Sequence, residues 1–497
     1  MLPLSQAVFA ILFPGLVSAL WIRSFALREP TGAWSIALGY GYFMGLFATV
    51  GLLLLWDGLG LGLHAPLTLL VWVALLLIWL VVHGRAGWAG LAAFRPRLKA
   101  VSLRGWQGWV WWLLLALLLF RLGVLAAEGF WRPLTPWDAW VVWIHRAELW
   151  AQSGTLLPFV ARDEWLHGAV PGAYTIDAHH YPKTVSLIPV WVALLAGGWN
   201  EDLVLLPWLG ALVALLIGLY GQVRRQGGEP WAAMLLVYAI GSLPLISSHT
   251  ALYGYADLWI AATLALAAVA LWSAREPAGA RWLLLAFPML LMLPALKVEG
   301  WVWLLAIAIG WAAGWATGWA VGGLRTRARW ITFASVAVLL PAGLVAFWLG
   351  GGSLSVPGLG EVVVSTERLS VPGLFTVELG YHPDALAALA YALFAGESWH
   401  LFWFVFWPVL LLGMIRCAGV PLARTAVWTL FVATALLAFL FLFTQVSAWV
   451  LSFSVVNRLL LHFVPLGAFV VWRVLHCVAQ RHAGMRPAQG PVGLGCP

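Results

Sequence analysis

Long apolar runs recur from one end of the chain to the other, and they restrict it to one kind of fold. Runs such as 113–119 and 203–219 contain no charged residue, and each apolar segment approaches the ~20 residues that a helix needs to cross a bilayer core. Charged residues make up 9% of the 497 residues, against roughly a quarter in an average soluble domain. These features exclude a soluble globular protein and predict an all-α, polytopic transmembrane helical bundle.

Thirteen apolar segments are predicted to span the membrane. They cover residues 3–22, 33–56, 66–83, 106–126, 203–223, 231–249, 257–273, 281–296, 301–320, 331–349, 399–415, 426–446 and 459–478. A further apolar segment, 185–196, is shorter, and counting it as a span would move Arg224 and Arg225 to the opposite side of the membrane. We therefore predict that this segment is interfacial or re-entrant.

Basic residues in the short loops all fall on one side of this threading, among them Arg23, Arg224, Arg416 and Arg481. Positively charged loops are retained in the cytoplasm, so the N-terminus is predicted to lie outside and the C-terminus in the cytoplasm of a bacterial inner membrane. This topology, rather than nucleic-acid binding, accounts for the formal net charge of +8. The 36 Trp suit the headgroup level of a protein with many crossings.

Two loops on the outer face are too long and too polar to be simple turns. They divide the chain into N-terminal spans (1–127), a first extracytoplasmic loop (128–184), a central helical core (185–349), a second extracytoplasmic loop (350–398) and C-terminal spans with a short tail (399–497). Within the second loop, the β-branched run Val362–Val364 predicts a short strand. The length and the Gly and Pro content of this loop predict a lid over the site.

A glycine repeat is predicted to have a structural role, and the cysteines are predicted to have no role in a disulfide. Gly310, Gly314 and Gly318 recur at four-residue intervals, which predicts a seam where two helices pack closely. All three cysteines map to the cytoplasmic side, so no structural disulfide is expected.

Ionisable residues beside membrane spans are functional candidates when they cluster, because they are costly there. Five of them reach the same outer face on this threading: Asp138, Lys183, Asp257, Lys297 and Glu299. The economical explanation is one shared site, to which the neighbouring Tyr181 and Tyr255 would also contribute.

This set suits transfer from a phosphate-linked donor. A carboxylate such as Asp138 can accept a proton from an attacking hydroxyl or amine, and lysines can neutralise the charge on a departing phosphate. Each residue has a structural alternative. Asp138 and Asp257 could cap the helices that follow them, Lys183 could extend to the headgroups, and Lys297 and Glu299 could simply pair at the end of a span.

A metal site is not predicted. Asp177, His179 and His180 are metal ligands by residue type, but their spacing is not diagnostic and an exposed, solvated His pair is the better explanation. We therefore expect no metal ligand and no cofactor.

The order of these features resembles the GT-C superfamily of integral membrane glycosyltransferases, which includes protein O-mannosyltransferases and the aminoarabinose transferase of lipid A. The likeness covers about 131–303. It rests on four ordered elements: Pro136-Trp137-Asp138-Ala139-Trp140 at the start of the first outer loop, Tyr181-Pro182-Lys183 at its end, Tyr255-Ala256-Asp257 before a later helix, and Leu296-Lys297-Val298-Glu299-Gly300 one hairpin on.

The resemblance implies an inverting enzyme that moves a sugar from a polyprenyl-phosphate donor to an unidentified lipid, glycan or protein acceptor outside the membrane. Asp138 would be the catalytic base or would orient the acceptor. Lys183 and Lys297 would bind the donor phosphate, while Asp257, Glu299, Tyr181 and Tyr255 would shape the sugar or acceptor pocket. A flippase for lipid-linked saccharides, or a polysaccharide polymerase or ligase, is the alternative.

We predict that the first long loop is extracytoplasmic. Ser153→Cys, made in a variant whose native cysteines are replaced by alanine, should react with a membrane-impermeant maleimide in intact spheroplasts. Gln226→Cys, beside the basic Arg224 and Arg225, should react only after lysis. The opposite pattern would invert the topology.

Overall fold

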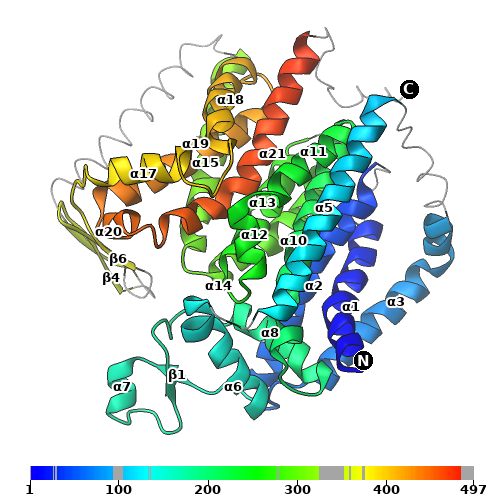
Figure 1. The fold of residues 1–497 in the computed structure, drawn as a ribbon, viewed down its shortest axis with the longest axis vertical. Helices are drawn as coiled ribbons and strands as arrows, with labels where there is room; N and C mark the ends of the chain where they lie inside the picture. The colour runs from blue at the N-terminus through cyan, green and yellow to red at the C-terminus, as the bar shows by residue number, and fades with distance from the viewer. Residues whose placement is uncertain are drawn as a thin grey trace. The chain divides into compact units, whose positions relative to one another are not determined.

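The computed structural model describes residues 2–25, 27, 31–92, 105–132, 134, 136–276, 279–323, 352–356, 360–371 and 375–482. The chain divides into two compact units, which are described separately. Unit 1 comprises Met1–Ala274, Ala278–Gly300 and Val464–Phe469, and unit 2 comprises Arg275–Pro277, Trp301–Phe463 and Val470–Pro497. Figure 1 labels their helices and strands.

Unit 1 is built almost entirely of helices. Its elements are α1 (Leu2–Phe25), α2 (Ala33–Gly58), α3 (Ala65–Ala92), α5 (Trp106–Trp131), the π-helix η1 (Ala139–Ile144), α6 (His145–Ser153), β1 (Phe159–Val160), α7 (Arg162–Leu166), β2 (Tyr174–Thr175), α8 (Thr184–Ala196), α9 (Glu201–Val204), α10 (Pro207–Arg225), α11 (Pro230–Gly241), α12 (Pro244–Ala251), α13 (Asp257–Ser273), the 3₁₀ turn η2 (Gly279–Trp282) and α14 (Leu283–Leu296). Strands β1 and β2 form a short parallel pair.

Unit 2 combines helices with one small sheet. Its elements are α15 (Gly300–Gly323), β3 (Gly352–Val356), β4 (Gly360–Val364), β5 (Arg368–Val371), β6 (Phe375–Glu378), α17 (Ala385–Phe394), α18 (Phe402–Arg416), α19 (Pro421–Phe443), α20 (Ser447–Leu451) and α21 (Val456–His482), whose middle belongs to unit 1. The strands form an antiparallel sheet in sequence order. Strand β4 confirms the strand predicted at Val362–Val364.

Nine helices among the described residues are long and apolar enough to cross a membrane, or ten if α11 and α12, bent by 64°, form one span. The thirteen predicted spans are therefore confirmed in part. The predicted spans 257–273 and 399–415 correspond to α13 and α18, which are shorter than 18 residues. The span predicted at 331–349 lies outside the described residues.

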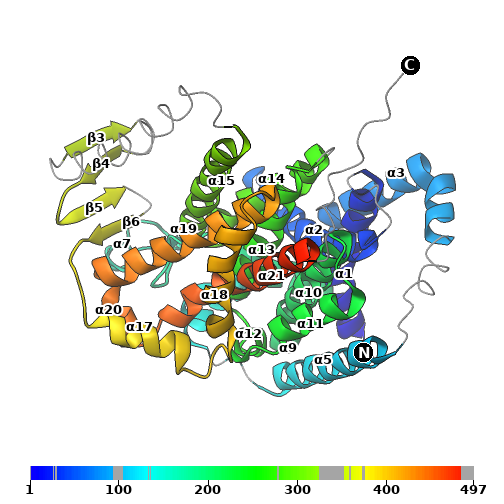
Figure 2. The same ribbon diagram turned by 90° about the horizontal axis from the view of Figure 1, so that it is seen from above.

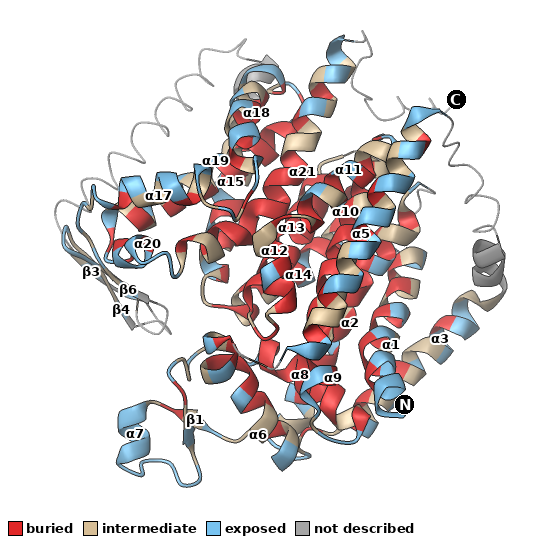
Figure 3. Ribbon diagram, in the orientation of Figure 1, coloured by how far each residue is buried: buried red, intermediate tan, exposed pale blue. Residues whose placement is uncertain are grey.

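The core of unit 1 is centred on α13. All but one of its 17 residues are buried, which is expected of a helix that is hydrophobic on every side. It packs against α10 and α14, and α10 in turn packs against α2. Figure 3 shows that α13 is buried, whereas one face of α5 is exposed. Figure 2 places α5 along the outside of unit 1.

Helix α8 excludes one of the two predicted alternatives, the interfacial one, and leaves the re-entrant one as a prediction. The segment was predicted to be interfacial or re-entrant, but eleven of its 13 residues are buried, whereas a helix on a membrane surface would expose one polar face. It contacts α1, α2, α6 and α14. It is therefore an internal element of unit 1 rather than a surface helix.

The two long loops, 128–184 and 350–398, contain regular structure. The loop 128–184 is partly helical, as predicted, and holds η1, α6 and α7. The loop 350–398 contains the sheet and α17, and Gln445 after α19 caps the edge of β6 by accepting the Glu378 N–H at 2.5 Å. The lid prediction for this loop stays a prediction.

The glycine seam predicted in α15 is confirmed for two of its three members. A Cβ atom on Gly310 would collide with Thr429, and one on Gly314 would lie 2.7 Å from the Thr425 Cα, both in α19. Close helix packing is thus the role of these glycines. The side chain at 318 is outside the described part of the chain.

Helix α2 offers a matched test of close packing in unit 1. A Cβ on Gly39 would lie 2.5 Å from the Gly218 Cα in α10, whereas a Cβ on Gly51 meets nothing within 4 Å. Gly39→Ala should therefore destabilise unit 1 by about 1–3 kcal/mol through overpacking, and Gly51→Ala should leave stability unchanged or slightly raised. Thermal unfolding of the two variants in detergent measures the difference. Equal midpoints would contradict this packing.

Candidate functional site

Three of the predicted site residues form a chain of ion pairs in unit 1. Lys297, directly after α14, places Nζ 2.9 Å from Asp257 Oδ1 and 3.0 Å from Glu299 Oε1. The Asp257 side chain is fully buried and that of Lys297 is 5% exposed, while Glu299 is 26% exposed. The structure brings these three of the five predicted residues together, and the pairing of Lys297 with Glu299 also fits the structural alternative. The interpretation of Asp257 as a simple helix cap is too narrow, because its carboxylate binds the lysine of another helix.

His249, at the end of α12, completes the inner side of this cluster. Its Nδ1 lies 3.8 Å from Asp257 Oδ2 and its ring packs against Tyr255, with ring centroids 5.2 Å apart. Trp208 fixes the same turn by donating from Nε1 to the Tyr255 carbonyl at 2.7 Å. Tyr255 therefore lies beside the ion pairs, as the predicted pocket requires.

Arg146 anchors the end of the loop 128–184. This buried guanidinium donates to the carbonyls of Tyr181 (2.9 Å) and Pro182 and to Ser186 Oγ (2.7 Å). Burial lowers the pKa of Arg146 to about 9. Its donors bind carbonyl and hydroxyl groups, so Arg146 sets the path of the chain into α8.

Tyr181 and His180 extend from this anchored segment. The Tyr181 ring lies between those of Trp143 and His180, with centroid distances of 5.4 and 5.0 Å. Burial and the nearby His179 lower the pKa of His180, and the Glu299 carboxylate opposes this shift in part. His180 is therefore within electrostatic reach of Glu299, and the loop end lies near the ion pairs.

Asp138 lies at the start of η1. It has helical backbone angles (φ −62°, ψ −32°) and makes no side-chain capping hydrogen bond, so the interpretation of Asp138 as a helix cap is wrong. The helix that follows Asp138 begins with a π-helical turn, η1, before α6. π-helical turns are rare in proteins. Where they occur, they often lie at functional sites.

A close backbone approach brings Asp138 toward the cluster. Gly254 has φ +99°, and a Cβ there would lie 2.5 Å from the Ala139 Cβ. Only glycine fits at such a contact. Gly254 is next to Tyr255, and Ala139 is next to Asp138, so the two turns lie side by side.

Lys183 stands apart from the ion pairs. It is exposed at the residue before α8, and its carbonyl accepts the Leu187 N–H at 3.0 Å. Its side chain makes no ion pair with any residue that the structure describes. The structure thus brings Lys297, but not Lys183, into the carboxylate cluster.

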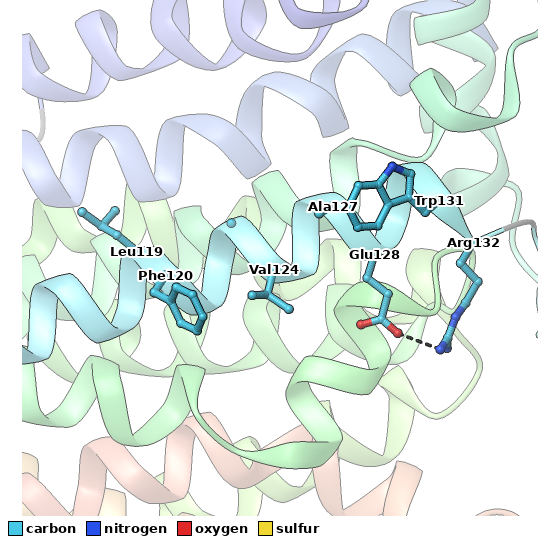
Figure 4. A pocket seen from close by; sticks show the side chains of 8 residues that line it. Leu119, Phe120, Val124, Ala127, Glu128, Trp131 and Arg132 are labelled. Atoms are coloured by element: carbon cyan, nitrogen blue, oxygen red, sulfur yellow. Dashed lines mark ion pairs between the residues drawn. The ribbon is translucent and has the colours of Figure 1, made fainter.

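A groove of about 790 Å³ runs along the exposed face of α5. Figure 4 shows its apolar residues Leu119, Phe120 and Val124, followed by the Glu128–Arg132 ion pair (2.8 Å) near one end. Tyr253 packs against Gly129 beside this end, and burial and Glu128 raise the pKa of Tyr253 to about 12. Tyr253 begins the turn that carries Tyr255 and Asp257.

Sequence reasoning missed His249 and the anchoring role of Arg146. His249 interrupts an apolar segment. An ionisable residue in such a segment is costly, and this cost was the signal that could have identified it. Arg146 could not be placed from sequence, because its partners are carbonyl groups 35 and 36 residues away. Among the described residues, no group of three or more His, Cys, Asp or Glu is placed to hold a metal ion.

Comparisons with known proteins identify no relative. No protein-family model, curated protein or solved structure matches the chain.

The buried ion pair predicts a non-additive mutant cycle. Lys297→Met should destabilise the protein by about 3–5 kcal/mol, because it leaves Asp257 buried without its lysine. The double variant Asp257→Asn/Lys297→Met should lose less stability than the two single variants together. Thermal unfolding in detergent measures these changes.

The exposed pair on α5 is the control for this cycle. Glu128→Gln removes a partly exposed contact between residues four apart and should change stability by less than about 1 kcal/mol. Additive effects at Asp257 and Lys297 would argue against a tight pair.

Proposed function

We propose that the chain is a membrane glycosyltransferase, which moves a sugar from a polyprenyl-phosphate donor to a lipid, glycan or protein acceptor. The observation that carries the proposal is the cluster of Lys297, Asp257 and Glu299. It lies at the end of the apolar helix α14 and the start of α13, beside the turn that holds Asp138. A lipid-linked donor cannot leave the bilayer, so its phosphate must be met where membrane helices end.

Lys297 is the group that binds the donor phosphate. Lysine is a compact point charge with three donors and a common phosphate ligand. The Asp257 contact holds Lys297 in place and uses only one of these donors. Lys183, at the exposed start of α8, makes the first contact with the phosphate as the donor approaches.

The groove on α5 supports a lipid-linked donor over a water-soluble one. Its walls are apolar along the helix and become polar at Glu128 and Arg132, which matches a molecule with a hydrocarbon tail and a charged head. Only 11% of the most apolar window of α5 is buried, so the groove is open to lipid. The polyprenyl chain lies along α5 and its phosphate points to the turn that begins at Tyr253.

The chemistry is a displacement at the anomeric carbon of the sugar. Asp138 accepts the proton of the acceptor hydroxyl or amine as its oxygen or nitrogen attacks. The bond from the anomeric carbon to the phosphate oxygen breaks, and its electron pair leaves with the phosphate. Lys297 stabilises the charge that develops on this leaving group, and Tyr181 and Tyr255 contact the sugar or acceptor.

Asp138→Asn tests the proposal directly. It should lower the transfer of a polyprenyl-phosphate sugar by about 10²- to 10⁴-fold, since the substitution removes a general base and nearly preserves shape. The purified protein should keep its thermal midpoint and its affinity for donor. Asp177→Asn, an exposed carboxylate of the same loop, is the matched control and should leave turnover unchanged.

Turnover is measured with purified protein and a panel of polyprenyl-phosphate sugars. Near-normal transfer by the Asp138 variant would remove this residue from the chemistry. Movement of intact lipid-linked sugar across a vesicle membrane, without transfer, would favour a flippase instead.

A further inference from the structure

We propose that Glu299 is an exchangeable counter-ion of Lys297, which occupies the place of the donor phosphate in the empty site and competes with it. This inference rests on the proposed function, because it assumes that Lys297 binds a phosphate. Glu299 was predicted to shape the sugar or acceptor pocket; here it competes with the donor phosphate for Lys297.

The two carboxylates on Lys297 are not equivalent. Asp257 is fully buried at the first residue of α13, where the helix dipole also favours a negative charge. The Glu299 side chain is 26% exposed, and its Oε2 is buried and accepts no hydrogen bond from any described residue. A buried oxygen without a donor is unfavourable, so Glu299 is the partner that leaves more easily.

The two carboxylates beside Lys297 favour such an exchange. With Asp257 and Glu299 ionised and Lys297 protonated, these three side chains carry a net charge of −1. A phosphate that approached Lys297 with both carboxylates in place would meet two like charges within a few ångströms of the lysine. When Glu299 withdraws, the anionic phosphodiester takes its place and the charge around Lys297 is conserved.

The local backbone allows this movement without a change of fold. Glu299 lies in the short turn between α14 and α15, where the Gly300 N–H donates to the Lys297 carbonyl at 2.9 Å. A Cβ on Gly300 would collide with the Leu293 carbonyl, so the turn is fixed and the side chain of Glu299 is the part that moves. His180 lies within electrostatic reach of the released carboxylate.

The exchange also explains how product leaves. The donor is a phosphodiester with one negative charge, whereas the product is a phosphate monoester with a charge of about −1.5 to −2 at pH 7. Lys297 alone would therefore hold product more tightly than donor. The return of Glu299 to Lys297 offsets this preference.

Binding of undecaprenyl phosphate to the full-length protein in nanodiscs tests the inference. Glu299→Gln should lower the dissociation constant at least tenfold relative to wild type, and Lys297→Met should raise it. Glu299→Asp keeps the charge and should bind nearly as wild type does. Glu164→Gln, on an exposed residue of the first outer loop, is the matched control and should have no effect.

Two further measurements separate this role from a structural one. Inorganic phosphate should compete with the lipid more effectively in Glu299→Gln than in wild type, which tests recognition of the phosphate apart from the lipid tail. In turnover, the same variant should lower both KM and kcat and be inhibited more strongly by added undecaprenyl phosphate. A residue needed only for folding would not tighten binding.

The outcomes distinguish the inference from the proposed function. Equal or weaker binding by Glu299→Gln, in a wild type that binds undecaprenyl phosphate through Lys297, would overturn the inference and leave the function intact. Tighter binding without any sugar transfer would support the counter-ion and contradict the transferase. Absence of saturable binding in every variant, Glu299→Gln included, would overturn both.

Discussion

The contact between Asp257 and Lys297 is the constraint on which the packing of α13 against α14 and the turns beside it depend. Either charge alone would be unfavourable at a buried position, so the start of α13 and the end of α14 must meet. This fixes the turn before α13, and with it the approach of Gly254 to Ala139. One buried ion pair thereby positions two further turns that carry polar groups.

Arg146 has the same effect on the loop 128–184. At a buried position, its guanidinium supplies the hydrogen bonds that two carbonyls and one hydroxyl would otherwise take from water. The guanidinium carbon also lies 5.2 and 5.4 Å from the ring centroids of Trp143 and Trp150. The loop therefore has a fixed return into α8 although most of its intervening residues are exposed. Arg146 thus holds the end of this loop in one place.

The sequence predicts the cluster better than it predicts the details around it. The bounds of α13 and the meeting of Asp257, Lys297 and Glu299 followed from apolar length and from the expense of charge near lipid. The internal position of α8 did not, because a short apolar run is compatible with a core, a re-entrant loop or a surface. The π-helical turn after Asp138 depends on tertiary contacts such as that of Gly254, which no local pattern encodes.

The enclosed position of α8 has a consequence for biogenesis. Its neighbours include α1 and α2, which are made before it, and α14, which is made almost a hundred residues after it. As the chain leaves the ribosome, α8 has part of its surface uncovered until α14 is in the membrane. The interior of unit 1 is therefore complete only after α13 and α14 have been made, and until then the surface of α8 that contacts α14 stays uncovered.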